Sequence, residues 1–344
     1  MSGSVHVVYP PSVTWSDKWQ RPHYLLKHLA DNGFIVHFIP WKIAENKQKD
    51  FSEASKIEVS GNFFVYRDYN AFARENCIET DDTVIIHATC PDGLKYSKQI
   101  RHDYFWFDYL DDYEEWQDGL KPCFDRADFI TCSGIKLCQK AKGMSGIKDV
   151  LLIENGVDFA KYSKAVEPLP CKQFDGKEKK FTIGFIGALC KELDYTLINH
   201  VIKQFDFARF VFIGNEIYGN KFSEKIKPFK DNVEYLSVLS DDDVVSCLSR
   251  FDVCIVLYDR DFHRVDYINS IKAYVYLSAG KRVVCSNLPD LSRFNDVLDV
   301  VENHDKNGFL RKLVAIYRGE KKADYEYVKK AQVIAKDHDW GLLS

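Results

Sequence analysis

The chain has 344 residues, of which 46% are hydrophobic and 28% are charged, and its formal net charge is −4 with a pI near 6.2. This composition excludes a disordered chain, and without a basic excess nucleic acid is not an expected partner. No apolar run approaches the roughly 18–20 residues of a membrane span, and the first residues do not read as a signal peptide, so we expect a cytoplasmic protein.

Short apolar runs alternate with helix-like stretches through the first half of the chain. Continuous apolar runs of this length, separated by helices, are typical of parallel strands that are buried on both faces. We expect one doubly wound domain over residues 1–165. Its predicted strands are Val5–Tyr9, Ile35–Ile39, Phe63–Tyr66, Thr83–His87, Tyr104–Phe107, Phe129–Thr131 and Val150–Ile153.

The same alternation resumes after residues 166–180, a segment of prolines and charge that we predict to be an interdomain linker. A second domain is expected over 181–325, and a helix at 326–344 either closes it or crosses back onto the first. Its predicted strands are Phe181–Ile186, Ala208–Ile213, Val233–Leu236, Val253–Leu257 and Arg282–Cys285. The sequence therefore predicts the α/β class, with two doubly wound Rossmann-like domains facing a cleft.

Ten cysteines are spread along the chain, and no two of them form a C-x-x-C pair. Most lie in apolar runs such as FDVCIVLY, which is typical of buried free thiols that act as small hydrophobic residues. The spacing gives little support for a zinc site.

The segment NSIKAYVYLSAGKRVVCS, residues 269–286, predicts a capped helix, a glycine stop and a buried strand. Asn269 or Ser270 is a suitable N-cap, and Gly280 stands where a left-handed C-terminal cap is expected. Lys272 then lies in the first turn, where a cation opposes the helix dipole by roughly 0.3–1 kcal/mol. A bound anion would resolve this conflict, and phosphate is the obvious candidate. A solvated lysine that tolerates the dipole is the alternative.

Two glycines and three cations add to this anion site. Gly184 and Gly187, in GFIGAL, are expected at the end of a strand, where missing side chains let a diphosphate approach backbone N–H groups. A packing or turn role is the alternative. Lys191 follows a few residues later, and Arg260 and Arg264 lie in the loop before the helix. With the helix lysine they form a predicted anion clamp, unless they belong to an ordinary solvated loop.

Several longer motifs occur in a characteristic order along nearly the whole chain. They are WSDKWQRPHYLLKHLADNGFIVHFIP, FDYLDDYEEW, ADFITCSGIKLCQKAKG, VLLIENGVDFAKY, FTIGFIGALCKELDYTLINHV and NSIKAYVYLSAGKRVV. In this order and spacing the chain resembles a GT-B glycosyltransferase of the family four type, near the bacterial polysaccharide-assembly branch.

The resemblance implies a transferase that moves a sugar from a nucleotide-diphosphate donor, with UDP-sugar favoured, to a hydroxyl of a growing glycan or lipid-linked acceptor. It implies retention of anomeric configuration, surface polysaccharide as the product, no cofactor and no metal. Asp259 and Asp261 form a D-x-D pattern, which binds a metal in the GT-A fold, but here we interpret it as an ordinary charged loop.

Site residues are expected in three groups. The predicted catalytic residues are His87, Asp108, Arg264 and Lys272. The predicted donor-binding residues are Gly184, Gly187, Lys191, Arg260, Tyr235, Asn269 and Ser270. The predicted acceptor-side residues are Trp15, Arg21, His23 and Asp112.

Structural roles remain open for several of these residues. His87 is as well explained as a satisfied structural histidine, and Asp108 and Asp112 as helix N-caps. Arg21 and His23 either serve the acceptor or cap the first helix. Trp15 is first of all a candidate for core packing.

In the family that the chain resembles, two glutamates contact the donor. Tyr267 and Val275 stand at these two positions here. Another carboxylate, such as Asp266 or Glu234, would then hold the ribose, or catalysis would be lost. A catalytically silent subunit that binds a partner transferase or glycan is therefore one alternative. A nucleotide-sugar epimerase or hydrolase is another.

Peripheral contact with the cytoplasmic face of the inner membrane is also expected from aromatic and basic residues. The segments concerned are Trp19–Leu29 and the lysines at 221, 225, 227 and 230.

Overall fold

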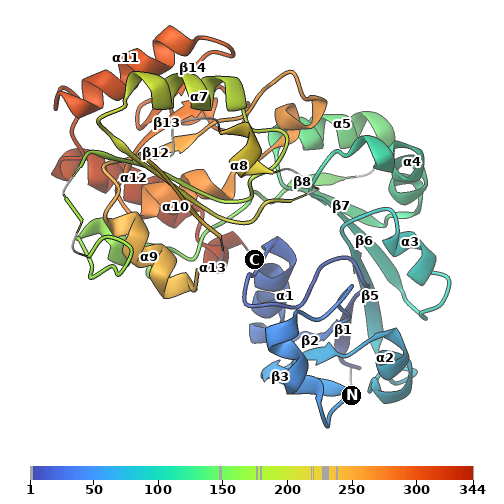
Figure 1. Cartoon of the computed structure of the whole chain (residues 1–344). Helices are drawn as coiled ribbons and strands as arrows, with labels where there is room; N and C mark the ends of the chain where they lie inside the picture. The colour runs from blue at the N-terminus through green and yellow to red at the C-terminus, as the bar shows by residue number, and fades with distance from the viewer. Residues whose placement is uncertain are drawn as a thin grey trace. The chain divides into compact units, whose positions relative to one another are not determined.

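The computed structural model describes residues 3–146, 149–175, 177–178, 180–217, 219, 221–226, 232–237 and 239–343 (Figure 1). The lysines at 227 and 230 lie outside these ranges. Contacts divide the chain into an N-terminal unit, Met1–Asn155 with Trp340–Ser344, and a C-terminal unit, Gly156–Asp339. The division falls between Asn155 and Gly156, ahead of the linker predicted at 166–180.

An eight-stranded sheet with the order β3-β4-β2-β1-β5-β6-β7-β8 forms the centre of the N-terminal unit. Every described pair in it is parallel except β3 with β4. The strands are β1 Val5–Tyr9, β2 Ile35–Phe38, β3 Lys56–Ser60, β4 Phe63–Tyr66, β5 Thr83–Ala88, β6 Tyr104–Tyr109, β7 Phe129–Cys132 and β8 Val150–Leu152.

Helices follow most of these strands, as parallel connections require. They are α1 Arg21–Asp31, α2 Tyr69–Glu75, α3 Gly93–Tyr96, α4 Gln117–Arg126 and α5 Ile135–Ser145, with 3₁₀ turns η1 Glu45–Phe51 and η2 Glu114–Trp116. Pro22 stands in the first turn of α1, where its missing N–H costs no helical hydrogen bond. Leu25 and Leu26 are buried, so the apolar face of α1 packs inward.

The end of the chain belongs to the N-terminal unit. The short helix α13, Trp340–Leu343, contacts α1. The rings of Trp340 and Tyr24 stack with centroids 5.1 Å apart and an interplanar angle of 7°. An aromatic pair of this kind is typically worth about 0.5–1.5 kcal/mol beyond the area it buries.

The C-terminal unit contains a fully parallel six-stranded sheet with the order β11-β10-β9-β12-β13-β14. Its strands are β9 Thr182–Ile186, β10 Arg209–Ile213, β11 Val233–Leu236, β12 Val253–Val256, β13 Arg282–Ser286 and β14 Leu298–Val301. Phenylalanine, valine and isoleucine fill the core around β9, β10 and β12, which are almost entirely buried.

The helices of the C-terminal unit are α6 Phe159–Tyr162, α7 Tyr195–Gln204, α8 Phe222–Lys225, α9 Asp241–Ser249, α10 Ile271–Ser278, α11 Lys306–Tyr317 and α12 Tyr325–Asp337. The 3₁₀ turns are η3 Ser163–Val166, η4 His263–Tyr267 and η5 Ser292–Phe294. Helix α10 packs on β12 and β13 and is covered by α12. Gly280 ends α10 with φ +63°, as predicted, and an added Cβ would meet the side chain of Val328 at 2.9 Å.

The predicted class, α/β with two Rossmann-like domains, is confirmed, and each predicted strand is present with small shifts at its ends. Two strands were missed. Strand β3, KIEVS, is a half-buried edge strand with charges on alternate positions. Strand β14, LDVV, contains Asp299, whose buried carboxylate pairs with Arg282. No helix among the described residues is long and apolar enough to span a membrane.

Gly184 lies in the middle of β9 and not at its end, and it makes room for an aromatic ring. A Cβ added there would come within 1.9 Å of the ring of Phe251. We expect Gly184→Ala to lower the free energy of unfolding by about 1–3 kcal/mol, because overpacking a buried site forces its neighbours to move. Urea denaturation measures this change.

Gly143→Ala is the matched control, because Gly143 lies in α5 and an added Cβ there meets nothing within 4 Å. This variant should be stabilised by about 0.5–1 kcal/mol. Equal stability of Gly184→Ala and the parent protein would contradict the packing role of Gly184.

Candidate functional site

The topology of the C-terminal unit directs attention to the carboxyl ends of β9 and β12. The chain runs outward from this pair of strands in both directions, and parallel sheets bind ligands at such a switch point. Gly187 follows β9 directly, Tyr258 follows β12, and Lys272 comes from the first turn of α10. We call these three residues, with Ser270, the Gly187–Lys272 corner.

Lys272 lies across Gly187. A Cβ added to Gly187 would come within 2.7 Å of Lys272 Cε and 3.4 Å of its Nζ, and Gly187 has a φ of +144°. The ammonium group donates a hydrogen bond to the hydroxyl of Tyr258 and lies 4.6 Å from the centre of that ring. The fold therefore brings together a lysine ammonium group, a glycine backbone without a side chain and the N-terminus of α10. These are groups that bind an anion.

Two polar side chains at the start of α10 are buried. Asn269 is 5% exposed and Ser270, the N-cap residue, is 3% exposed. The Ser270 side chain makes no capping hydrogen bond, and its hydroxyl has no protein partner among the described residues. A buried hydroxyl without a partner costs roughly 1–3 kcal/mol, so a ligand that supplied an acceptor here would be favoured.

The predicted cations occupy different environments. Arg264 Nε lies 3.5 Å from the carboxylate of Glu192, a buried residue that the sequence analysis missed. Arg260 donates to Asp266 from its Nε at 3.0 Å, so this arginine is already held by a carboxylate. Lys191 is exposed. Of the predicted clamp, Lys272 is thus the cation that lies against the glycine backbone.

Two predicted donor-binding residues lie away from this corner. Gly184 accommodates Phe251, as described above. Tyr235 lies on β11, the edge strand, which β10 separates from β9. Its ring packs against Phe222 with centroids 5.8 Å apart.

The carboxylates proposed to replace the missing glutamates are both engaged. Asp266 pairs with Arg260, and Glu234 lies on the edge strand, where Arg209 and Lys177 bind it. Val275 is 7% exposed and belongs to the core of the unit. The Tyr267 ring lies 5.1 Å from that of His263.

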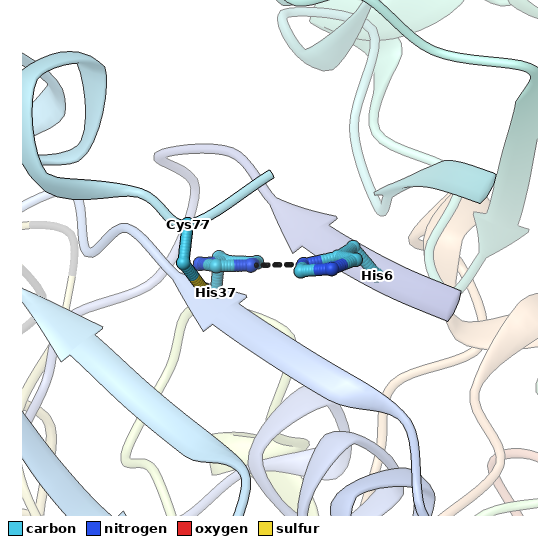
Figure 2. Close-up of side chains that lie close together, drawn as sticks. All are labelled: His6, His37 and Cys77. Atoms are coloured by element: carbon cyan, nitrogen blue, oxygen red, sulfur yellow. Dashed lines mark hydrogen bonds between the residues drawn. The ribbon is translucent and has the colours of Figure 1, made fainter. Parts of the chain in front are cut away.

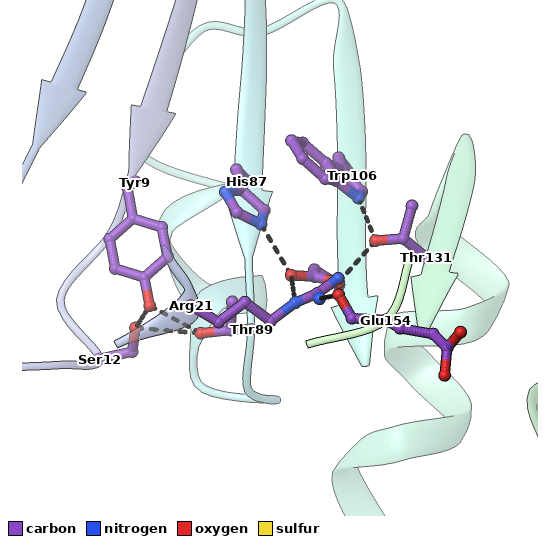
Figure 3. Close-up of polar contacts among 9 residues, drawn as sticks. Tyr9, Ser12, Arg21, His87, Thr89, Trp106, Thr131 and Glu154 are labelled. Carbon is purple, nitrogen blue, oxygen red and sulfur yellow. Dashed lines mark hydrogen bonds and ion pairs between the residues drawn. The ribbon is translucent and has the colours of Figure 1, made fainter. Parts of the chain in front are cut away.

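In the N-terminal unit, Arg21, His87 and Asp108 form one buried network at the carboxyl ends of the strands (Figure 3). Arg21 donates from Nε and Nη2 to the two oxygens of Asp108, at 3.0 Å each, and from Nη1 to the backbone oxygen of Glu154 at 2.9 Å. His87 Nε2 lies 3.4 Å from the same carboxylate, and Thr131 donates to it at 2.6 Å.

Burial and the neighbouring charges shift the pKa values of Asp108 and His87. Burial alone would raise the pKa of Asp108, but the adjacent guanidinium of Arg21 and the bond to His87 hold it well below its usual range. Burial lowers the pKa of His87, which stacks on Trp106 with centroids 3.8 Å apart. Asp108 and His87 are both 0% exposed. The geometry of His87 favours the structural alternative, a satisfied histidine. Asp108 lies in β6 and pairs with Arg21 instead of capping a helix, and each of its oxygens already accepts a hydrogen bond from the protein.

Next to this network, three hydroxyls gather where β1 and β5 end, at the switch point of the N-terminal sheet (Figure 3). Ser12 donates to the Tyr9 hydroxyl at 2.6 Å, and the Tyr9 oxygen lies 2.8 Å from that of Thr89. The sequence does not point to these three residues, because isolated Ser, Thr and Tyr residues carry no spacing signal.

The remaining acceptor-side residues are buried as well. Trp15 is 5% exposed and packs on Phe38 with centroids 5.6 Å apart. His23 accepts a hydrogen bond from the Gln20 amide, so it caps α1, and burial lowers its pKa to about 4. Asp112 is 0% exposed and accepts from Lys140 at 2.7 Å. Trp15 and His23 thus take the structural alternatives given for them, core packing and capping of α1, whereas the pairing of Asp112 with Lys140 was not among the alternatives.

Of the two D-x-D aspartates, Asp259 is half-buried and Asp261 is exposed. Asp259, Asp261 and His304 bring ligand atoms within 4.8 Å of one another, and His304 Nε2 lies 3.0 Å from Asp261. Exposed acidic groups of this kind are common without a metal.

Known proteins resemble this chain in fold over almost its whole length and in sequence over part of it. No family model matches the chain. The chain is 26% identical over 222 residues to the Bacillus subtilis (strain 168) protein TuaH, whose name describes a glycosyltransferase of teichuronic acid biosynthesis. The match covers 63% of this chain and 55% of that protein, so it spans about half the length of its curated relative.

Solved structures resemble almost the whole chain. Sucrose-phosphate synthase from Thermosynechococcus elongatus matches with a TM-score of 0.72 and 14% identity, covering 99% of this chain and 96% of that one. An E. coli trehalose-6-phosphate structure bound with UDP-2-fluoro glucose matches with a TM-score of 0.72 and 11% identity, covering 99% and 97%. The chain therefore has the GT-B fold of two Rossmann-like domains, and it resembles the glycosyltransferases that share this fold.

Proposed function

We propose that the protein is a glycosyltransferase that moves a sugar from a nucleotide-diphosphate donor to a hydroxyl of a growing glycan or lipid-linked acceptor. The observation that carries this proposal is the Gly187–Lys272 corner at the switch point of the C-terminal sheet. The relative TuaH supports a role in surface polysaccharide assembly. The sugar nucleotide bound by a protein of the same fold supports uridine diphosphate as the leaving group.

The chemistry follows from where charge develops. As the glycosidic bond to the diphosphate breaks, negative charge accumulates on the phosphate oxygens, and a fixed cation with free N–H groups stabilises it. Lys272 and the first turn of α10 would provide this stabilisation. We propose that the reaction retains configuration, so that the departing phosphate itself takes the acceptor proton and no protein base is needed. The buried position of Asp108 is consistent with this.

Neither a metal nor a cofactor has a role in this proposal, because Lys272 and backbone amides would replace the cation that other transferases use. Contact with a membrane would be peripheral. Of the basic residues proposed for it, Lys221 and Lys225 are exposed.

A silent subunit is the second candidate, and one observation favours it. Val275 and Tyr267 stand where related enzymes carry donor-binding glutamates, and Val275 belongs to the core. A subunit of this kind would bind a partner transferase or glycan and would leave a nucleotide sugar unchanged. An epimerase or hydrolase would instead consume the donor without any acceptor.

A thermal-shift screen against UDP, GDP, CMP, dTDP and ADP, first without and then with magnesium, tests the proposal. A site filled at 100 times its dissociation constant adds about 2.7 kcal/mol, which raises the unfolding midpoint visibly. We expect a selective response to UDP that is unchanged by magnesium. A well-folded sample that responds to none of the nucleotides would favour the silent subunit, and a response that requires magnesium would contradict a metal-independent site.

A further inference from the structure

Three potential metal ligands from separate segments meet in the N-terminal unit, near the start of β1 (Figure 2). They are His6 in β1, His37 in β2 and Cys77, which follows α2. The sheet register pairs Val8 with His37, and His6 lies two residues before Val8, so both histidines point to the same face. One ligand atom from each residue lies within 4.8 Å of the other two.

The two rings present their nitrogens to each other. His6 Nδ1 and His37 Nε2 are 2.8 Å apart, and the ring planes differ by 11°. The side chains of His6 and His37 are 1% and 0% exposed, whereas Cys77 is exposed. Water is therefore almost excluded from the two histidines, whereas Cys77 is in contact with solvent.

The other nitrogen of each ring is in contact with a further side chain. His6 Nε2 lies 3.0 Å from the carboxylate of Asp82, and His37 Nδ1 lies 2.9 Å from the hydroxyl of Tyr66. Asp82 is itself held by the backbone amides of Ser4 and Glu79, at 2.8 Å each. Histidines that bind metals typically have their second nitrogen held by a carboxylate or another oxygen in this way.

We propose that His6, His37 and Cys77 bind a zinc ion that ties β1, β2 and the segment after α2 together. One thiolate and two imidazoles form a ligand set that suits zinc, and the exposed side leaves a fourth position for water. The site is separate from the carboxyl ends of the strands, where Arg21 and Asp108 lie.

Neutral imidazole is the form of histidine that binds metals. The side chains of His6 and His37 are buried, and burial disfavours the charged form of the ring.

The protons can be accounted for without a further reactant. Without metal, Asp82 accepts from His6 Nε2, so the proton shared by the rings is on His37 Nε2 and Tyr66 donates to His37 Nδ1. On binding zinc, that proton moves to His37 Nδ1, which then donates to Tyr66, and the Cys77 thiol releases its proton to solvent. Zinc–nitrogen bonds of about 2.0–2.1 Å separate two tetrahedral ligands by roughly 3.3–3.4 Å, so the rings would move apart by about 0.5 Å.

Metal analysis of the whole purified protein after incubation with zinc chloride and gel filtration tests the site. We expect one zinc per chain in the parent protein and much less zinc in Cys77→Ser. Loss of a residue that only supports a ligand typically weakens metal binding 10–100-fold, and loss of the Cys77 ligand itself should weaken zinc binding by more than that. Cys77 is exposed, so this variant should fold. Two controls should keep their zinc: Cys90→Ser, a half-buried cysteine elsewhere, and His304→Gln, in the exposed aspartate group.

Cobalt gives a second measurement on the same proteins. Cobalt bound to a thiolate produces a charge-transfer absorption band, which we expect in the parent protein and in Cys90→Ser but not in Cys77→Ser. Equal zinc binding by Cys77→Ser and the parent, loss of zinc in His304→Gln only, or no zinc in any of the proteins would overturn the proposal.

Discussion

Lys272→Ala is expected to weaken the binding of UDP by about 10- to 150-fold and to lower the transfer rate by about 10²–10³. The first figure corresponds to about 1.5–3 kcal/mol for hydrogen bonds to a charged group, and the second to the loss of one preorganised donor at a developing negative charge. Titration calorimetry with UDP measures the binding, and the unfolding midpoint without nucleotide should stay nearly unchanged, because Lys272 is only partly buried.

Lys203→Ala is the control for this variant. Lys203 is an exposed lysine in the last turn of α7, whereas Lys272 lies against Gly187. We expect the control to bind UDP nearly as well as the parent protein does. Equal affinity in Lys272→Ala and the parent would remove Lys272 from the donor site.

Arg21→Ala should lower the free energy of unfolding by about 3–5 kcal/mol, the typical cost of leaving one partner of a buried ion pair alone. Asp108 is 0% exposed, and Arg21 binds both of its oxygens. Urea denaturation at pH 7 measures the loss. Lys27→Ala is a control for an ordinary surface pair, because Lys27 and Asp31 are 35% and 43% exposed, and it should cost less than about 1 kcal/mol.

The effect of Arg21→Ala should depend on pH in one direction. Because the pKa of Asp108 is depressed in the folded protein, its ion pair contributes stability above the unfolded pKa of about 3.9 and loses it as the pH falls further. In the variant, the buried carboxyl can take up a proton instead. The difference in stability between the two proteins should therefore narrow from pH 7 toward pH 4, and a constant difference would contradict an ionised Asp108.

The sequence was informative wherever local pattern decides structure. Apolar runs marked the buried strands, and the cap at Ser270 and the stop at Gly280 marked α10, so the position of Lys272 in its first turn followed. Strand β14 was hidden because Asp299 interrupts its apolar pattern, and only the folded protein supplies the partner, Arg282, that makes this buried charge tolerable.

Side-chain partnerships across the sheet were harder to predict. A carboxylate at a strand end can face a substrate or pair with a distant residue, and Asp108 finds Arg21, which lies 87 residues away in the sequence. The bond between Lys272 and Tyr258 also depends on how α10 packs on β12. For the same reason the contact of His6 and His37 was missed, since 31 residues separate them and no metal motif has that spacing.

The release of UDP from a UDP-sugar, measured with and without a lipid-linked glycan acceptor, tests the central claim most directly. We predict release that depends on the acceptor in the parent protein and in Lys203→Ala, and that falls by about 10²–10³ in Lys272→Ala. Release at the same rate with and without acceptor would indicate a hydrolase. No release at all from a protein that binds UDP would contradict a transferase and indicate a silent subunit.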